Sequence, residues 1–553
     1  MLVKKTSEQR YETKVLDHLG LVAGMCKELK IAEVIDTHIP NNSSDKILST
    51  GNGIVGLILN GLGLVNKRLY LVSHFFKNKP VDKLLNVSYL ESSHFNDDAL
   101  GRSLDAVYEF GVSKLYSLIS SQAVGYLSEK YDLQVSSGQL DNTNFHLHGK
   151  EKHLALEDGQ VLEIVKGYSK DHRPDLVQIG LQLIVENESR IPLLMEVLSG
   201  NQEEGKSYGA FISNYASQLK KDYGVKLVVV DSKLYNQENL SILSQKGSIK
   251  WITRVPNHLK VVKELISSID KEGFKPLKNY EKYKYQVVCN DYGSVNQRWL
   301  VLFSEMKYER DLKGLNKKLL KTGLVAQKEF KKLSKEEFET KESAYSAANM
   351  FSNELKYNNL ENISIHSKKH YKRAGKPKKN QKPDRVSYYI QANISSDIEQ
   401  YVVEKEKIGY FILATNELKE TEISADILLE HYKNQSSVER SFRFLKDPNI
   451  VASSLFVQKP ERMTAILMVM TLCLLVYSAL EYATRTLLKK KNLTFPNQQG
   501  KPIQNPTMKW IFEYFEGIHI LYISDNQHFV LNLNENQRRI LNLLGGNFKG
   551  FYT

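Results

Sequence analysis

The stretch His431–Pro448, HYKNQSSVERSFRFLKDP, carries the most informative pattern in the sequence. Its polar residues Tyr432, Gln435, Glu439 and Lys446 stand at offsets of 0, 3, 7 and 14. On one continuous helix, these offsets point to about 0°, 300°, 340° and 320°. One narrow face would then carry a phenol, an amide, a carboxylate and an ammonium, whereas a core-facing stripe would be apolar. This pattern predicts a site that handles a metal ion and a phosphodiester.

The composition limits the class of protein. The chain has 553 residues, which is too long for one simple core and predicts two to four domains. Hydrophobic residues make up 41% and charged residues 25%, as in ordinary folded proteins. The formal net charge of +13 favours a polyanionic partner, most simply nucleic acid, because phosphate contacts release counterions. A basic protein with a generic surface is the alternative.

Several features bear on the cell compartment. Cys26, Cys289 and Cys473 are far apart and odd in number, so they predict neither a disulfide framework nor a zinc site, and a reducing cytoplasm fits. The first residues, MLVKKTSEQRYETK, contain no apolar signal core. Met463–Leu480 lacks formal charge and is long enough to raise the question of a membrane span. Because polar residues interrupt it and charges flank it, we expect a buried core helix and no membrane partner.

The periodicity of apolar residues changes along the chain and divides it into regions. Helical spacing dominates up to about residue 130, and strand-like alternation begins at GQLDNTNFHLHG. We predict a helical N-terminal domain at 1–130 that is a candidate for DNA-end binding, a catalytic core at 131–257 and 405–485, an insertion domain with a basic loop at 258–404, and a C-terminal module at 486–553.

The core region alternates strands and helices. LVQIGLQLIVENESRIPLLMEVLSGN reads as two strands joined by a turn at Glu188–Arg190. GKSYGAFISNYASQLKKDYG reads as an amphipathic helix, KLVVVDSKLY as a short buried strand, and IKWITRVP as another strand. The order of three strands, helix, strand, helix and strand predicts an α/β fold, with a mixed sheet flanked by helices.

The insertion region is rich in lysine. A lysine-rich helix is expected around Leu312–Phe338, and SKKHYKRAGKPKKNQKPDR places nine basic residues between Lys368 and Arg385. A flexible, solvated loop is one interpretation of that run. Its lysines alternate with glycine, proline and single aromatic residues inside a domain, so we expect it to contact nucleic acid.

Two aspartates complement Glu439. Asp141 lies in the first predicted strand of the sheet, where a bare carboxylate does not suit a core. Asp231 directly follows the apolar run Leu227–Val230, at the carboxyl end of a buried strand, where open α/β sheets bind ligands. Taken alone, each aspartate also fits a turn or a helix cap. Asp175 competes as the first carboxylate, but it follows an Arg-Pro pair typical of a turn.

The three carboxylates together predict an RNase-H-like order. They occupy the first strand, the end of the fourth strand, and the helix after the insertion. Three carboxylates at one point repel one another, and a pair of divalent cations relieves that repulsion. Oxygen ligands favour Mg²⁺ or Mn²⁺ over zinc. We therefore expect Asp141, Asp231 and Glu439 to be catalytic and to hold two metal ions.

With these residues in place, the chain resembles bacterial insertion-sequence DDE transposases of the Tyr-Arg-Glu-Lys signature group, in the type-four insertion-sequence superfamily. The signature has the form Tyr-x2-Arg-x3-Glu-x6-Lys, and Tyr432, Glu439 and Lys446 stand at its spacing. LDNTNFHLHG and VVVDSKLYNQENL match the regions of the family's first and second aspartates. The resemblance covers nearly the whole chain and is weakest at the N-terminus.

The resemblance implies cut-and-paste transposition. Mg²⁺-dependent cleavage at terminal inverted repeats would be followed by strand transfer into target DNA. It further implies double-stranded DNA partners, a homodimer in the synaptic complex, and a bacterial, nucleoid-associated location. Tyr432 and Lys446 are expected to hold DNA phosphates.

One position departs from the family pattern. The signature arginine is Gln435 here, and glutamine cannot form a bidentate charged clamp on phosphate. Arg443 would lie near the same helix face and is our candidate to replace it. Two alternatives therefore stay open: a catalytically impaired DNA-binding derivative of a transposase, and an RNase-H-like DNA nuclease.

Overall fold

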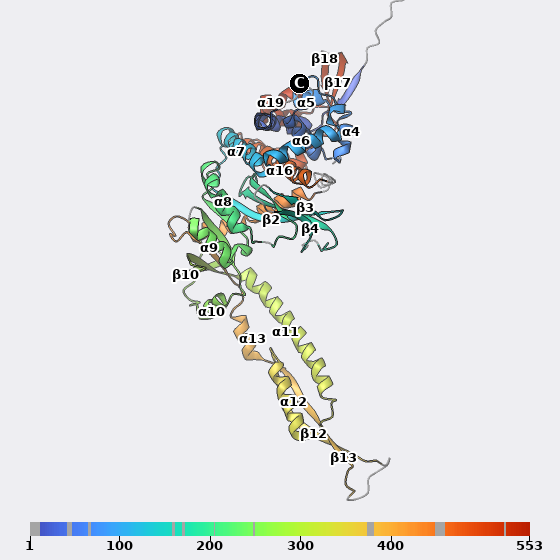
Figure 1. Ribbon diagram of the computed structural model, residues 1–553. Helices are drawn as coiled ribbons and strands as arrows, with labels where there is room; N and C mark the ends of the chain where they lie inside the picture. The colour runs from blue at the N-terminus through green and yellow to red at the C-terminus, as the bar shows by residue number, and fades with distance from the viewer. Residues whose placement is uncertain are drawn as a thin grey trace, which may run out of the picture.

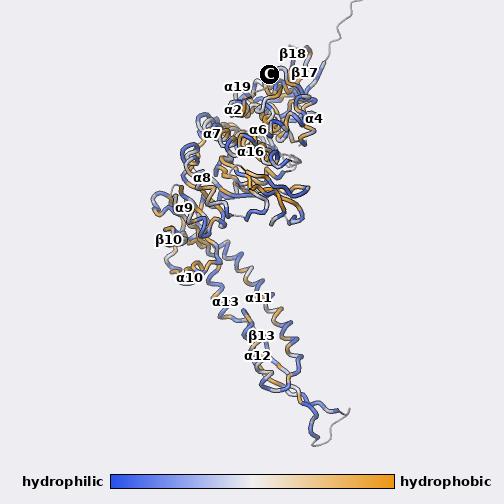
Figure 2. Tube along the Cα trace, viewed as in Figure 1, coloured by the Kyte–Doolittle hydropathy of each residue, from blue (hydrophilic) through white to orange (hydrophobic). Residues whose placement is uncertain are grey.

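The computed structural model describes residues 11–40, 47–64, 68–156, 161–168, 172–203, 205–246, 249–372, 381–447, 459–524 and 527–553. Figure 1 shows an elongated molecule with a helical end, a sheet in the middle and a long arm. Figure 2 shows apolar residues gathered in the helical end and the sheet, while much of the arm is hydrophilic. The buried core therefore lies in the body, and the arm projects from it.

The helical end is built around one buried helix, α16 (Pro460–Lys490). α16 packs against α3, α6 and α7, and Arg462 binds both carboxylate oxygens of Asp105 on α6 at 2.7 Å. By length and composition α16 could cross a membrane, but 94% of its most apolar window is buried in the protein, as predicted for a core helix. The N-terminal elements are β1 (Glu12–Val15), α1 (Leu19–Glu28), α2 (Ile31–His38), α3 (Thr50–Leu62), η1 (Leu69–Leu71), α4 (Val72–Phe76), α5 (Val81–Leu85), η2 (Ser92–Phe95), α6 (Asp97–Phe110) and α7 (Val112–Tyr131).

The C-terminal segment completes the same helical end. Strand β1 pairs with β17, and α19 packs on α1, where Gly24 lies so close to the Phe548 ring that a Cβ would approach it to 2.6 Å. The predicted first and last regions of the chain therefore share one core. The C-terminal elements are β15 (Phe495–Pro496), β16 (Pro502–Ile503), α17 (Met508–Tyr514), β17 (His519–Ser524), β18 (Gln527–Leu531), α18 (Glu535–Leu544), α19 (Gly546–Lys549) and η5 (Gly550–Tyr552).

The middle of the molecule is an 11-stranded mixed sheet with the order β3-β4-β5-β2-β7-β8-β14-β11-β10-β9, and β6 pairs with β5. Strand β7 is parallel to both β2 and β8, and the other pairs are antiparallel. The predicted mixed α/β class is confirmed, whereas the RNase-H-like arrangement stays a prediction. The strands are β2 (Ser137–Leu147), β3 (Lys152–Ala155), β4 (Val161–Lys166), β5 (Val177–Glu186), β6 (Pro192–Ser199), β7 (Leu227–Val230), β8 (Lys250–Val255), β9 (Lys275–Pro276), β10 (Tyr283–Tyr292), β11 (Val295–Ser304) and β14 (Tyr410–Thr415).

Strands β10 and β11 correct one prediction. We expected them inside the insertion domain, but β11 pairs with β14 and extends the main sheet. Trp299 is fully buried, and Leu300 and Leu302 pack with Leu413 in one apolar cluster. Because this burial comes from residues more than 100 positions away, no local pattern could indicate it. The helices of this part are η3 (Ser232–Leu234), α8 (Tyr208–Lys221), α9 (Gln237–Lys246), α10 (Lys260–Ser268), α14 (Ala425–Lys433) and α15 (Ser436–Leu445).

The arm is a helix and a helix-covered hairpin. It contains α11 (Glu305–Leu333), α12 (Lys341–Glu354), β12 (Asn358–His370), β13 (Arg385–Ser396) and α13 (Ile398–Lys405). A small apolar core forms where α12 covers the hairpin, around Ala344, Ala348 and Ile390. The described parts of the predicted basic run lie at the end of β12 and just before β13, and its part at 373–380 falls outside the described residues.

Candidate active site

Strand register places Asp141 and Asp231 side by side. β2 and β7 are parallel, with Ser137 opposite Leu227 and Leu140 opposite Val230. Asp141 and Asp231 are the next residues on the two strands. β7 ends there, and the Asp231 side chain caps η3 by accepting a hydrogen bond of 2.9 Å from the Lys233 amide. The two aspartates therefore follow paired positions of adjacent strands, at the point where β7 ends.

Tyr208 is a third member of this site that the sequence did not reveal. Its hydroxyl donates a hydrogen bond of 3.2 Å to Asp141 Oδ1, which also accepts one of 2.8 Å from the Asn142 amide. The Tyr208 side chain is fully buried. Burial, followed by the charges of Asp141 and Asp231, raises the pKa of Tyr208 well above its ordinary value. The phenol therefore stays protonated and donates to the carboxylate.

Asn239 fixes the start of the helix that carries Tyr208. Its Oδ1 accepts a hydrogen bond of 3.0 Å from the Gly209 amide, and its Nδ2 donates one of 2.6 Å to the Gly205 carbonyl. Asn239 is fully buried, and a Cβ at Gly209 would lie 2.8 Å from the Asn239 Cα. Glycine at 209 is therefore required for this close approach. The amide of Asn239 positions α8, and through it Tyr208, beside Asp141.

The helix carrying Glu439 corrects the predicted continuous helix over His431–Pro448. α14 ends at Lys433 and α15 begins at Ser436, with Gln435 as the residue before it. Asn, Gln, Ser and Ser follow one another here, and asparagine and serine compete for backbone hydrogen bonds and favour helix ends. Tyr432 and Glu439 consequently lie on different helices, and the four polar groups do not form one helical face.

α15 nevertheless lies on the side of the sheet that bears the two aspartates. Gln139 Nε2 donates a hydrogen bond of 3.1 Å to the carbonyl of His431, near the end of α14. Gln139 and Asp141 share a face of β2 because side chains alternate along a strand. α15 packs on β2 and β5 through Val438 and its neighbours, while Glu439 is exposed.

The structure brings two of the three predicted carboxylates together. Across the described ranges, no three or more His, Cys, Asp or Glu side chains gather closely enough to hold a metal ion. The role of Glu439 as the third ligand therefore stays a prediction. Asp141 and Asp231 by themselves fit the oxygen donors that Mg²⁺ and Mn²⁺ prefer, and a cation would relieve their mutual repulsion.

The other residues predicted to bind DNA phosphates lie along the same stretch. Tyr432 is half-buried and its ring centroid lies 6.4 Å from that of Phe411, so its ring packs at the edge of the core. Gln435 is half-buried between the two helices, and Arg443 is exposed on α15, one turn beyond Glu439. Lys446 directly follows α15. Pro448, the last residue of the predicted stretch, lies outside the described residues.

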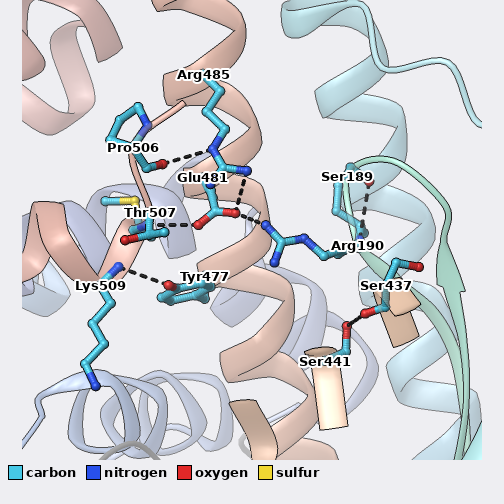
Figure 3. A network of polar contacts seen from close by, with 12 residues as sticks. Ser189, Arg190, Ser437, Ser441, Tyr477, Glu481, Arg485, Pro506, Thr507 and Lys509 are labelled. Atoms are coloured by element: carbon cyan, nitrogen blue, oxygen red, sulfur yellow. Dashed lines mark hydrogen bonds and ion pairs between the residues drawn. The ribbon is translucent and has the colours of Figure 1, made fainter. Parts of the chain in front are cut away.

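A buried polar network anchors the surroundings of α15 (Figure 3). Glu481 on α16 accepts hydrogen bonds from Arg190, in the turn between β5 and β6, and from the amide of Met508 at 2.9 Å. Arg485 Nη1 lies 2.9 Å from the same carboxylate. Burial, followed by the charges of Arg485 and Arg440, lowers the pKa of Arg190. The network joins the hairpin turn, α16 and the segment before α17 next to α15.

Comparisons with known proteins give little beyond the N-terminal region. Residues 11–121 match the family model described as "Domain of unknown function (DUF4277)". No curated protein matches the chain. One similar solved structure is the cryo-EM structure of a piggyBac transposase synaptic complex with hairpin DNA, at 9% identity and a TM-score of 0.37, covering 92% of this chain and 81% of that chain. That TM-score is too low to establish a shared fold.

Proposed function

We propose that this chain is a DNA transposase of the DDE type. It would cleave DNA strands at the ends of a mobile element and transfer them into target DNA by cut-and-paste transposition. The observation that carries the proposal is the placement of Asp141 and Asp231 at adjacent positions of two parallel strands. The spacing of Tyr432, Glu439 and Lys446 and the net charge of +13 support it.

Asp141 and Asp231 would hold two Mg²⁺ or Mn²⁺ ions together with Glu439. Such ions lower the pKa of a bound water or hydroxyl and stabilise charge on the leaving oxygen. The protein's own residues would do the rest. Tyr208 would hold the Asp141 carboxylate in one orientation through its hydrogen bond. Lys446, Tyr432, Arg443 and Gln435 would bind phosphates of the DNA.

For Glu439 to join the aspartates, α15 must approach the strand ends more closely than in this structure. The junction between α14 and α15 is where such a movement would occur, because the helix is already interrupted at Asn434 and Gln435. We propose that DNA and metal binding favour the closed arrangement. The partners would be terminal inverted repeats and target DNA, with two copies of the chain in the synaptic complex, in a bacterial cytoplasm.

A second candidate function is a DNA-binding derivative with impaired catalysis. Two observations favour it: Gln435 replaces the signature arginine, and the three carboxylates do not gather among the residues that the structure places. An RNase-H-like nuclease is the remaining alternative, because it would use the same aspartates without strand transfer.

One experiment separates these functions. A labelled duplex from the flanks of the coding region is incubated with the protein, Mg²⁺ and plasmid DNA. A transposase cleaves the end and joins the label to the plasmid, a nuclease only cleaves, and an impaired derivative only binds. Glu439→Gln should abolish cleavage and joining. Activity that survives this substitution would contradict the assignment of Glu439.

A further inference from the structure

The basic residues of α11 form a stripe along one side of the helix. At about 100° per residue, six of them fall within about 40° of a common direction. The stripe consists of Arg310, Lys313, Lys317, Lys321, Lys328 and Lys331. All six side chains are exposed. At 1.5 Å per residue, the stripe is about 32 Å long.

The acidic residues of α11 lie away from the stripe. Three of the four lie about 120° from its centre, and Glu309 lies about 80° from it. They are Glu305, Glu309, Asp311 and Glu329. Arg310 Nε comes no nearer than 3.9 Å to Asp311, and its side chain is 76% exposed. Within the described ranges, the side chains of Lys313, Lys317, Lys321, Lys328 and Lys331 form no ion pair or hydrogen bond. Apart from the 3.9 Å approach of Arg310 to Asp311, the described residues therefore give the stripe no ion-paired counter-charge.

The opposite side of α11 faces the protein. Leu315 and Ala326 are buried, and Phe330 and Leu333 pack against the small core of the arm. α11 forms one edge of the arm in Figure 1. Leu320 and Leu324, on or beside the stripe, are exposed. Interspersed among the cations, these leucines do not form the continuous apolar side that a basic amphipathic helix buries in lipid.

We infer that the α11 stripe is a binding surface for the backbone of duplex DNA. DNA carries a phosphate about every 3.4 Å along each strand, so a straight row of cations about 32 Å long can contact several phosphates. Lysine and arginine contacts with phosphates carry no base information, so this surface binds DNA of any sequence. The inference rests on the proposed function only in taking DNA as the partner.

The test uses the salt dependence of binding by the full chain. Binding to a fluorescent duplex of arbitrary sequence is measured by anisotropy across a range of salt concentrations. Log K falls as log salt rises, and each lost phosphate contact lowers the steepness of that fall, here called the salt slope, by about 0.9. The triple variant Lys313→Gln, Lys317→Gln and Lys321→Gln should lower the slope by about 2 to 3. Circular dichroism should be unchanged, because all three side chains are exposed.

The matched control removes the same charge elsewhere. Lys220, Lys221 and Lys549 are exposed on other helices, and their triple change to glutamine should leave the slope near that of the wild type. Equal slopes in the two triple variants would overturn the inference. Loss of binding to vesicles of phosphatidylserine and phosphatidylcholine, with DNA binding unchanged, would overturn it in favour of a membrane.

Failure of this inference differs from failure of the proposed function. If the wild type cleaves and joins DNA while the stripe variant keeps its salt slope, only the stripe is wrong. If the slope falls as expected while no cleavage or joining occurs, only the catalytic proposal is wrong.

Discussion

The aspartates of the central strands and the lysines of the arm are held in opposite ways. Asp141 and Asp231 are brought together by strand register, and a buried phenol positions one of them. The lysines of the α11 stripe are separated by helical turns and are exposed. Charges that do chemistry at one point need several fixed contacts each. Charges that attract a long polyanion act additively, so each contributes a little and none needs a fixed side-chain position.

The largest effect should follow loss of one of the two carboxylates beside the central strands. Asp231→Asn should reduce the rate of strand cleavage by about 10²–10³-fold or more, because it removes a charge from the centre of the site. Single-turnover cleavage of a labelled duplex measures this. Asp175→Asn is the control, since that carboxylate is exposed and pairs with Arg173. An equal loss in the control would show that the first carboxylate has been assigned to the wrong aspartate.

The next effect is on the stability of the protein and tests whether Asn239 fixes the start of α8. Asn239→Ala should lower the free energy of unfolding by about 1–3 kcal/mol, because the buried Gly209 amide and Gly205 carbonyl lose their partner. Urea denaturation measures this. Asn353→Ala, at an exposed position of α12, should change the stability little. Equal values for the two variants would mean that Asn239 does not fix α8.

A smaller effect on the cleavage rate tests whether the Tyr208 hydroxyl positions Asp141 or the ring only packs in the core. Tyr208→Phe keeps the ring but removes the hydrogen bond to Asp141, and should slow cleavage about tenfold. The apparent Mg²⁺ requirement should rise as well, which a purely structural change would not cause. Tyr215→Phe changes the same atom further along α8, away from Asp141. If the Tyr208 and Tyr215 variants had the same cleavage rate and Mg²⁺ requirement, Tyr208 would have no role in positioning Asp141.

The smallest effect is expected on the arm. Lys317→Gln alone should change the cleavage rate less than about twofold and lower the salt slope of DNA binding by about 0.9. Cleavage and anisotropy assays on the same preparation measure both. A tenfold loss of cleavage from this one substitution would show that Lys317 makes a specific contact. The arm would then not act through additive charges.

Local patterns predicted much of the sheet and less of the site. The strands around Asp141 and Asp231 were predicted because apolar alternation and a four-residue apolar run are local signals. The polar spacing alone did not predict the break between α14 and α15, although Asn434, Ser436 and Ser437 are weak helix formers that compete for backbone hydrogen bonds. Tyr208 could not be found, since an aromatic residue at the start of an amphipathic helix is usually part of the core. Its contact with Asp141 depends on Asn239, which lies on another helix, 30 residues from the Gly209 amide that it binds.

The buried helix α16 has a consequence for the synthesis of the protein. The helices it packs against, α3, α6 and α7, are made long before it leaves the ribosome. Until then the apolar side chains of these helices that face α16 have no partner, so this part of the N-terminal region cannot reach its final packing. A ribosome that stops before Pro460 would release a chain with exposed apolar surface, suited to aggregation or proteolysis. Incomplete chains should therefore be degraded sooner than the intact protein.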